Sequence, residues 1–130
     1  MRSPVLCVDL ETTMPEINRI MTSKRYRHLP VIDNKKRPLG MISDRDVLRF
    51  NLKALQKDFQ SDLSPVSEVM TKEVLTAAPD AEIREVVRVM FDEKIGAIPI
   101  TGGAGEVSGI ITRSDILRAL LDQGPIELWV

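Results

Sequence analysis

The sequence has very little cysteine and histidine, the residues that form disulfide frameworks and many metal and catalytic sites. It holds one cysteine, Cys7, and one histidine, His28, among 130 residues. A single cysteine excludes an internal disulfide and leaves no cysteine-rich metal site. No arranged nucleophile–base pair is visible along the chain. We therefore predict that the protein is not an enzyme and requires no cofactor.

Long apolar runs and an excess of charge of one sign are also missing. The formal net charge is -1 and the sequence pI is about 5.9, which gives no long-range attraction to nucleic acid or to an anionic membrane. No apolar run approaches the roughly 18 residues of a membrane span, and no signal-peptide pattern opens the sequence. These absences predict a cytoplasmic soluble protein whose partners include neither nucleic acid nor a membrane.

The sequence contains an internal repeat. Sliding the chain by 69 positions aligns residues 1–61 with 70–130 without a gap and gives 13 identical pairs. The pairs include Gly40/Gly109 and Asp46/Asp115, and many other positions exchange one apolar residue for another. A match of this length, with the hydrophobic pattern in step, indicates a tandem duplication.

Each half has the pattern of a β-α-β-β-α unit. Alternating apolar residues between turn-rich segments predict strands over 5–8, 29–32 and 39–42, with counterparts over 74–77, 98–101 and 107–111. The spacing of Thr13 and Glu16 predicts a capped helix in the first half, and Asp80 is the predicted cap in the second. Further helices are expected over 44–54 and 114–122.

A unit of about 60 residues buries too little apolar surface to be stable alone. We therefore predict an α+β (α/β) fold in which two repeated β-α-β-β-α units pack sheet to sheet about a pseudo-twofold axis. The first repeat is assigned to 1–61, with a linker from about 55. The second is assigned to 62–130 and includes a lead-in.

The doubled motif of a hydroxyl residue and an aspartate has the features of a nucleotide site. Ser43 precedes Asp46 by three positions, as Thr112 precedes Asp115. The N–H groups of a helix start and a nearby hydroxyl suit a phosphate, and a carboxylate accepts hydrogen bonds from the vicinal diol of ribose. The alternative is ordinary helix capping, which a duplication would also repeat.

Four segments carry a resemblance to a known family. They are "HLPVID" (residues 28–33) with "LGMISDRDVLR" (39–49) in the first half, and "AIPIT" (97–101) with "SGIITRSDILR" (108–118) in the second. They resemble the CBS domain, named after cystathionine beta-synthase. The whole chain resembles a tandem pair of CBS domains, also called a Bateman module.

The resemblance implies a regulatory module that binds an adenosine-containing small molecule in the clefts between its halves and signals the energy or metabolite state of the cell. AMP, ADP or ATP are the first candidates, and NAD or S-adenosylmethionine are alternatives. The motif aspartate is expected to hold the ribose, and the motif Ser or Thr to help with phosphate. One expected site combines Thr112, Asp115 and Arg113 with Arg27, His28 and Cys7. The other combines Ser43, Asp46 and Arg45 with Thr76, Ala77 and residues 96–97.

We expect the Asp115 site to bind more tightly, because Arg27 and His28 supply cations where the other half has Gly96 and Ala97. One charge-assisted phosphate contact contributes roughly 1.5–3 kcal/mol. The family also implies a homodimer formed through the helices, and an unidentified regulated protein is a further expected partner. The alternative is a dimerisation or interaction module that works without a ligand.

Overall fold

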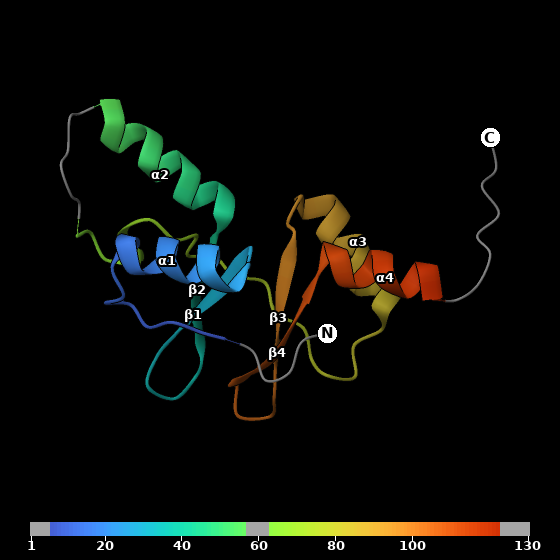
Figure 1. Ribbon diagram of the computed structural model, residues 1–130. Helices are drawn as coiled ribbons and strands as arrows, with labels where there is room; N and C mark the ends of the chain where they lie inside the picture. Colours follow the sequence, from blue (N-terminus) through green and yellow to red (C-terminus); the bar gives the residue numbers. More distant parts are fainter. Residues whose placement is uncertain (1–5, 57–62, 123–130) are drawn as a thin grey trace, which may run out of the picture. The chain divides into compact units, whose positions relative to one another are not determined.

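A computed structural model describes residues 6–56 and 63–122 (Figure 1). The described residues form two compact units, which divide after Val74. The first unit holds α1 (Met14–Lys24), β1 (His28–Ile32), β2 (Pro38–Ser43), α2 (Asp44–Gln56) and a 3₁₀ turn, η1 (Val66–Glu68). The second holds α3 (Ile83–Glu93), β3 (Ala97–Thr101), β4 (Val107–Thr112) and α4 (Arg113–Asp122). The predicted mixture of helices and short strands, repeated in order, is confirmed.

The two sheets have the same register. β1 pairs antiparallel with β2, with Leu29 opposite Ile42, and β3 pairs antiparallel with β4, with Ile98 opposite Ile111. An irregularity interrupts each pairing at the equivalent place, after Val31 in β1 and after Ile100 in β3. The duplication in the sequence is therefore also a duplication of backbone geometry.

The strands predicted over 5–8 and 74–77 are wrong in length. Each contributes a single bridging residue, with Val8 parallel to Val31 and Ala77 parallel to Ile100. The pairing stops because the chain turns at once: the Asp9 carboxylate accepts a hydrogen bond from the Glu11 N–H at 2.9 Å. Residue 5 of the first predicted strand lies outside the described residues.

The predicted cap of the first helix is confirmed, and that of the third is wrong. Thr13 caps α1, and its Oγ1 accepts from the Glu16 N–H at 3.4 Å. Asp80 lies in a turn closed by a hydrogen bond from the Ala81 N–H to the Ala78 carbonyl. This turn delays the start of α3 to Ile83, so that its cap position is Glu82, which makes no side-chain capping bond.

Replacement of Thr13 by alanine is expected to lower the free energy of unfolding by about 1 kcal/mol, because one capping bond is lost. Urea denaturation followed by circular dichroism measures the loss. The control is Glu82→Ala, the equivalent position in the second repeat, which makes no such bond. If the two variants lost the same stability, the cap at Thr13 would contribute nothing.

The apolar cores contain aliphatic side chains and methionine, in a chain of which only 4% is aromatic. The core of the first unit is built on Ile17, Leu29 and Ile42, which are fully buried. The second unit has a smaller core of Val86, Met90 and Ile98. Other large apolar side chains of the second unit are exposed: Ile83, Phe91, Leu117, Leu120 and Leu121.

Residues 63–74, which include the end of the predicted linker and lead-in, pack on the first unit. The Met14 N–H donates to the Ser64 carbonyl at 2.9 Å, and Val66 is fully buried. Met41 and Thr71 exchange two backbone hydrogen bonds of 3.0 and 2.9 Å. The compact units therefore divide after Val74.

Candidate functional site

In the first unit, the candidate site is a closed set of hydrogen bonds where β2 meets α2. The backbone N–H and the Oγ hydroxyl of Ser43 both donate to Oδ2 of Asp46, each at 2.9 Å. The Asp46 N–H donates back to Ser43 Oγ at 3.2 Å. We call this three-bond arrangement the Ser43–Asp46 clamp.

The second unit repeats the arrangement where β4 meets α4. The N–H and Oγ1 of Thr112 donate to Oδ2 of Asp115 at 2.8 and 2.9 Å. The Asp115 N–H donates to Thr112 Oγ1 at 3.3 Å. This Thr112–Asp115 clamp has the same atoms in the same roles, so the doubled motif forms the same local structure twice.

The clamps cap their helices, and capping uses part of the chemistry expected of the site. The hydroxyl of Ser43 or Thr112 donates its only proton to an aspartate oxygen. That hydroxyl can donate to a phosphate only after the bond to the aspartate is broken. The expected help with phosphate therefore competes with the clamp.

Two N–H groups at the start of α2 are also occupied. The Asp44 N–H donates to the Arg27 carbonyl at 2.9 Å, and the Asp46 N–H donates to Ser43. In α4 the Arg113 N–H donates likewise to the Gly96 carbonyl at 3.0 Å. These helix starts therefore offer a phosphate fewer N–H donors than the sequence pattern predicts.

In each clamp the other aspartate oxygen, Oδ1, is the atom that can accept a hydrogen bond from a ligand. In both clamps the hydrogen bonds from the serine or threonine go to Oδ2, and Oδ1 is the other oxygen of the same fixed carboxylate. In the second unit the Arg118 guanidinium lies 3.7 Å from Asp115 Oδ1, and the Asp115 side chain is only 9% exposed. A carboxylate oxygen held in this way is a suitable acceptor for a hydroxyl group of a ligand.

The clamp keeps Asp115 ionised. Burial raises the pKa of its carboxyl, but the hydrogen bonds from the Thr112 N–H and hydroxyl lower it more, and Arg118 adds to the lowering. The net result is a pKa below the usual value of about 3.8. Asp115 is therefore an anionic acceptor at neutral pH.

This lowered pKa predicts a pH dependence of stability. A carboxyl with a lower pKa in the folded protein stabilises it above the pKa of the unfolded chain, and the contribution is lost as pH falls through the folded pKa. The difference in unfolding free energy between the wild type and Asp115→Asn should thus be constant above about pH 5 and shrink below about pH 4. Urea denaturation across this range measures it. A difference that does not change with pH would contradict the account.

The structure places Arg27 and His28 beside the clamp of their own repeat. His28 lies opposite Ser43 in the β1–β2 register, as Ala97 lies opposite Thr112. The combination of Arg27 and His28 with Asp115, expected from the family, stays a prediction.

The other predicted site residues lie in the first turns of α2 and α4 and in the segments around the bridging residues Val8 and Ala77. Arg45 and Arg113 are exposed in the first turns of α2 and α4. Thr76 is exposed and precedes Ala77, whose N–H donates to the Pro99 carbonyl at 3.1 Å. Cys7 is half-buried, and burial raises the pKa of its thiol although Lys36 opposes the shift.

A groove on the first unit was missed by the sequence analysis. It lies between α1 and α2, has a volume of about 480 Å³ and is open to solvent. The residues that line it include Met21, Thr22, Arg25, Arg27, Val47 and Leu48. Among the described residues, no group of three His, Cys, Asp or Glu side chains is placed to hold a metal ion. Nor, over the same ranges, is any helix long and apolar enough to cross a membrane.

The amino-acid sequence is similar to part of a longer known protein. The inosine-5'-monophosphate dehydrogenase of Methanocaldococcus jannaschii is 32% identical over 114 residues. The match covers 88% of this chain but only 21% of the dehydrogenase. The chain thus corresponds to about a fifth of that enzyme's length.

Solved structures share the fold. The CBS domain pair of protein MJ0100, in complex with 5'-methylthioadenosine and S-adenosyl-L-methionine, superposes with a TM-score of 0.78 at 26% identity, over 92% of this chain and 93% of the other. CBSX2 in complex with AMP gives 0.79 at 26% identity, over 92% and 90%. The family model for the CBS domain matches residues 1–53 and again 66–122. The chain therefore belongs to the CBS-domain family and is a tandem pair of CBS domains.

Proposed function

We propose that the chain is a regulatory module that binds an adenosine-containing ligand and passes the energy or metabolite state of the cytoplasm to a protein that it regulates. AMP, ADP and ATP are the preferred ligands, with NAD and S-adenosylmethionine as alternatives. The observation that carries the proposal is the pair of clamps, each holding a carboxylate in a fixed orientation. The complexes of MJ0100 and CBSX2 with adenosine compounds support it.

The proposed chemistry is recognition without a covalent step, so that no catalytic residue or cofactor takes part. The ribose hydroxyls donate to the aspartate oxygen that the clamp does not use. Because the clamp already fixes the carboxylate, binding costs little side-chain entropy. The geometry that the two clamps share gives each repeat the means to hold one ribose.

We propose that the Asp115 clamp belongs to the tighter site. Its carboxylate is nearly buried and ionised, and both features strengthen a hydrogen bond from a ribose hydroxyl. The exposed cation Arg113 adjoins it. As the family resemblance implies, Arg27 and His28 add the cations that meet the phosphate.

The second candidate function is a dimerisation or interaction module that works without a ligand. The exposed leucines of α2 and α4 favour it, because a family member that pairs through its helices would bury them: Leu48, Leu52, Leu55, Leu117, Leu120 and Leu121. Under this alternative the clamps act only as helix caps. The two functions are compatible, since dimerisation uses the helices and ligand binding uses the clamps.

A thermal-shift panel with AMP, ADP, ATP, NAD, NADH and S-adenosylmethionine tests the proposal. A ligand at about 100 times its dissociation constant adds roughly 2.7 kcal/mol to the stability of the folded state. For a chain of 130 residues this raises the melting temperature by several degrees. A selective rise supports the sensor and identifies its ligand. Unchanged melting with all six compounds would favour the interaction module.

A further inference from the structure

The groove between α1 and α2 carries polar residues that the second repeat lacks at the equivalent positions. Its apolar residues have apolar equivalents in the second repeat: Met21/Met90, Val47/Ile116 and Leu48/Leu117. Several of its polar residues are replaced there by apolar residues or by glycine: Asn18/Val87, Thr22/Phe91, Arg27/Gly96 and Asn51/Leu120. At these positions the first repeat therefore adds hydrogen-bonding groups to an apolar pattern that both repeats share.

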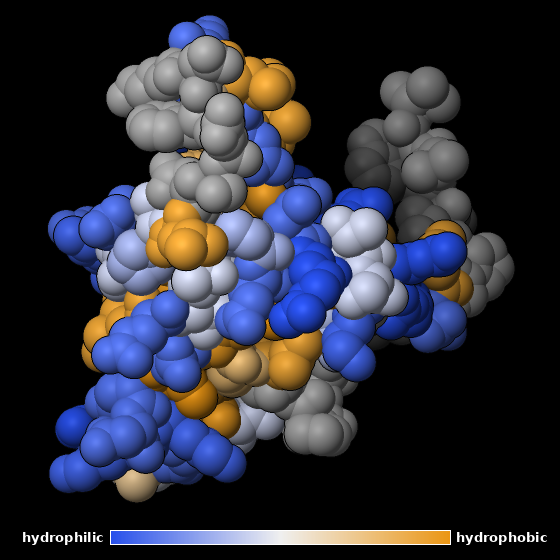
Figure 2. Space-filling model, turned by 60° about the vertical axis from the view of Figure 1, so that its left-hand side comes forward, coloured by the Kyte–Doolittle hydropathy of each residue, from blue (hydrophilic) through white to orange (hydrophobic). Residues whose placement is uncertain are grey.

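The apolar floor of the groove comes from both helices. Met21 of α1 and Val47 of α2 are buried residues that line it, and the neighbouring Leu48 is 59% exposed. Figure 2 shows hydrophobic surface over α2 next to hydrophilic surface. The groove can therefore bury an apolar side chain of a partner, which is favourable because apolar surface is removed from water.

Two exposed amide side chains line the groove, Asn18 from α1 and Asn51 from α2. Among the described residues, neither amide has a hydrogen-bond partner. Each amide offers one acceptor oxygen and two donor hydrogens, which complement the N–H and C=O of a peptide group. Thr22, also exposed at the groove, adds a hydroxyl. These groups suit the main chain of an extended peptide, whose N–H and C=O need partners.

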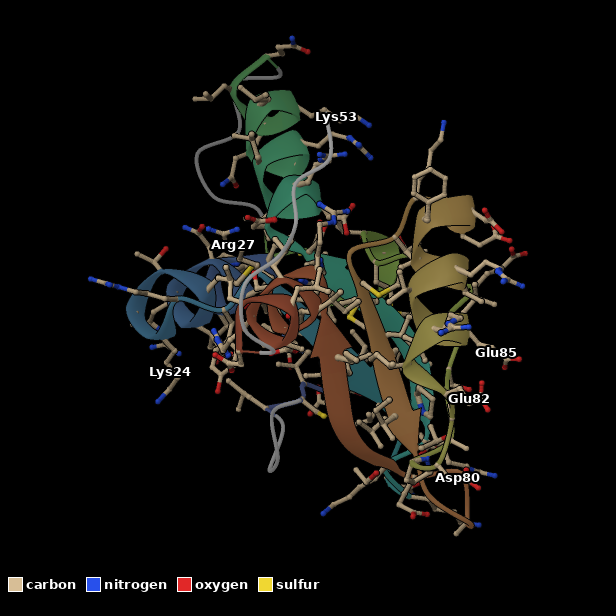
Figure 3. The ribbon with its side chains drawn as sticks, turned by 90° about the vertical axis from the view of Figure 1, so that its right-hand side faces the viewer. Lys24, Arg27, Lys53, Asp80, Glu82 and Glu85 are labelled. Atoms are coloured by element: carbon tan, nitrogen blue, oxygen red, sulfur yellow. The ribbon has the colours of Figure 1, made fainter. Side chains whose placement is uncertain are left out.

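The charge of the groove favours an acidic partner. Of the described residues that line it, Arg25 and Arg27 are cationic and Asp44 is the one carboxylate. Over α1, α2 and residues 25–27, seven cationic side chains outnumber three carboxylates. Figure 3 shows three of these cations: Lys24, Arg27 and Lys53. A segment with carboxylates is therefore attracted to this face, and a basic segment is repelled.

We propose that the groove between α1 and α2 binds an extended acidic peptide segment of the protein that the module regulates. One apolar side chain of the segment lies on the apolar floor. The main chain bonds to the two amides, and the carboxylates meet the arginines. The proposal rests on the proposed function only in that the partner is the regulated protein. The clamps take no part in it, and the whole groove lies within the first unit.

The amides argue against other occupants of the groove. A helix uses its own N–H and C=O groups internally, so its main chain offers Asn18 and Asn51 nothing to bind. A leucine-rich face, such as that of a second copy of the chain, would cover the amides without satisfying them. Buried polar groups that are left without partners cost free energy. An extended segment satisfies the amides and the apolar floor together.

Selection from a phage-displayed library of random nine-residue peptides tests the partner chemistry. Peptides are selected on the wild type and counter-selected on Arg25→Glu, which reverses one charge at the groove. Arg27 stays unchanged because it is a predicted nucleotide contact. The expected consensus has acidic residues beside one large apolar residue. Lys35→Glu makes the same change of charge at an exposed residue outside the groove, and this control should bind the selected peptides as the wild type does.

Three outcomes of the selection would overturn the proposal. The first is no enrichment, as would follow if a second copy of the chain covered the groove. The second is a basic or purely apolar consensus. The third is an acidic consensus that binds Arg25→Glu as well as the wild type, because attraction would then not depend on the groove.

Asn51→Leu tests the contact with the peptide main chain. It gives the first repeat the residue found at the equivalent position of the second. Leucine is a better helix former than asparagine, so the variant should fold, and an unchanged circular dichroism spectrum checks this. Loss of one hydrogen bond should raise the dissociation constant of a selected peptide by about 2- to 12-fold in fluorescence anisotropy. Equal or tighter binding, as expected of an apolar occupant, would refute the main-chain contact and the proposal.

The thermal shift with the adenosine ligand, measured on both groove variants, separates failure of the docking site from failure of the sensor. Arg25→Glu and Asn51→Leu leave the clamps intact and should keep the ligand response. A chain that responds to the ligand but selects no acidic peptide refutes only the docking site. A chain that selects such peptides but responds to no adenosine compound refutes only the sensor.

Discussion

Asp115→Ala is expected to weaken binding of the adenosine ligand by about 10- to 150-fold, more than Asp46→Ala does. The factor corresponds to the roughly 1.5–3 kcal/mol contributed by a hydrogen bond to a charged group. Asp115 is expected to lose more because its carboxylate is nearly buried and ionised, so that its bond to a hydroxyl is less weakened by water.

Isothermal titration of each variant with the ligand found in the panel measures these losses. Both substitutions also remove a helix cap, which costs about 1 kcal/mol of stability. The matched control is therefore Thr13→Ala, which removes the cap of α1 and no clamp carboxylate. It should lose stability and keep its affinity. Equal losses of affinity in Asp115→Ala and Asp46→Ala would refute the assignment of the Asp115 clamp to the tighter site.

Gly40→Ala is expected to lower the free energy of unfolding by about 1–3 kcal/mol through overpacking. A β-carbon at Gly40 would lie 2.8 Å from the carbonyl oxygen of Thr71 and would overlap the side chain of Met70. The methionine can move, but the carbonyl accepts the Met41 N–H in the bridge that attaches residues 63–74 to the first unit. The added methyl group must therefore push this bridge apart.

Gly103→Ala is the control for this substitution, because a β-carbon there meets nothing within 4 Å. Thermal or urea denaturation of both variants gives the comparison, and only Gly40→Ala should be destabilised. If Gly40→Ala were as stable as the wild type, residues 63–74 would not be packed against β2 as described.

The elements that the sequence predicts well are those with a strong hydrophobic period. The strands around Leu29 and Ile42 and the helices that follow Thr13 and Ser43 are found within a few residues of their predicted bounds. Because the two halves of the sequence align, each of these elements has a predicted counterpart in the other repeat. The prediction that Asp80 caps the helix is wrong, because Asp80 lies in a turn over Ala78–Ala81 and the helix begins only at Ile83.

Tertiary contacts account for what the sequence analysis missed. The groove exists only because α1 packs beside α2, and no local pattern reports such packing. The clamp residues were predicted, but the direction of their hydroxyl bonds follows only from the geometry.

The choice among adenosine compounds depends on groups other than the clamp. A carboxylate that accepts from a ribose diol meets the same diol in AMP, ATP, NAD and S-adenosylmethionine. Discrimination by the number of phosphates requires other side chains, of which Arg27, His28 and Arg113 are the predicted ones. The sequence and the clamps together therefore predict the class of ligand, and the panel selects its member.

The most direct test of the central claim is a titration of the wild type with the best adenosine compound of the panel and with its 2',3'-dideoxy form. The account predicts that removal of the two ribose hydroxyls weakens binding at least about 10-fold, because the clamp carboxylates lose their donors. Equal affinity for both compounds would contradict recognition of the ribose by Asp46 and Asp115.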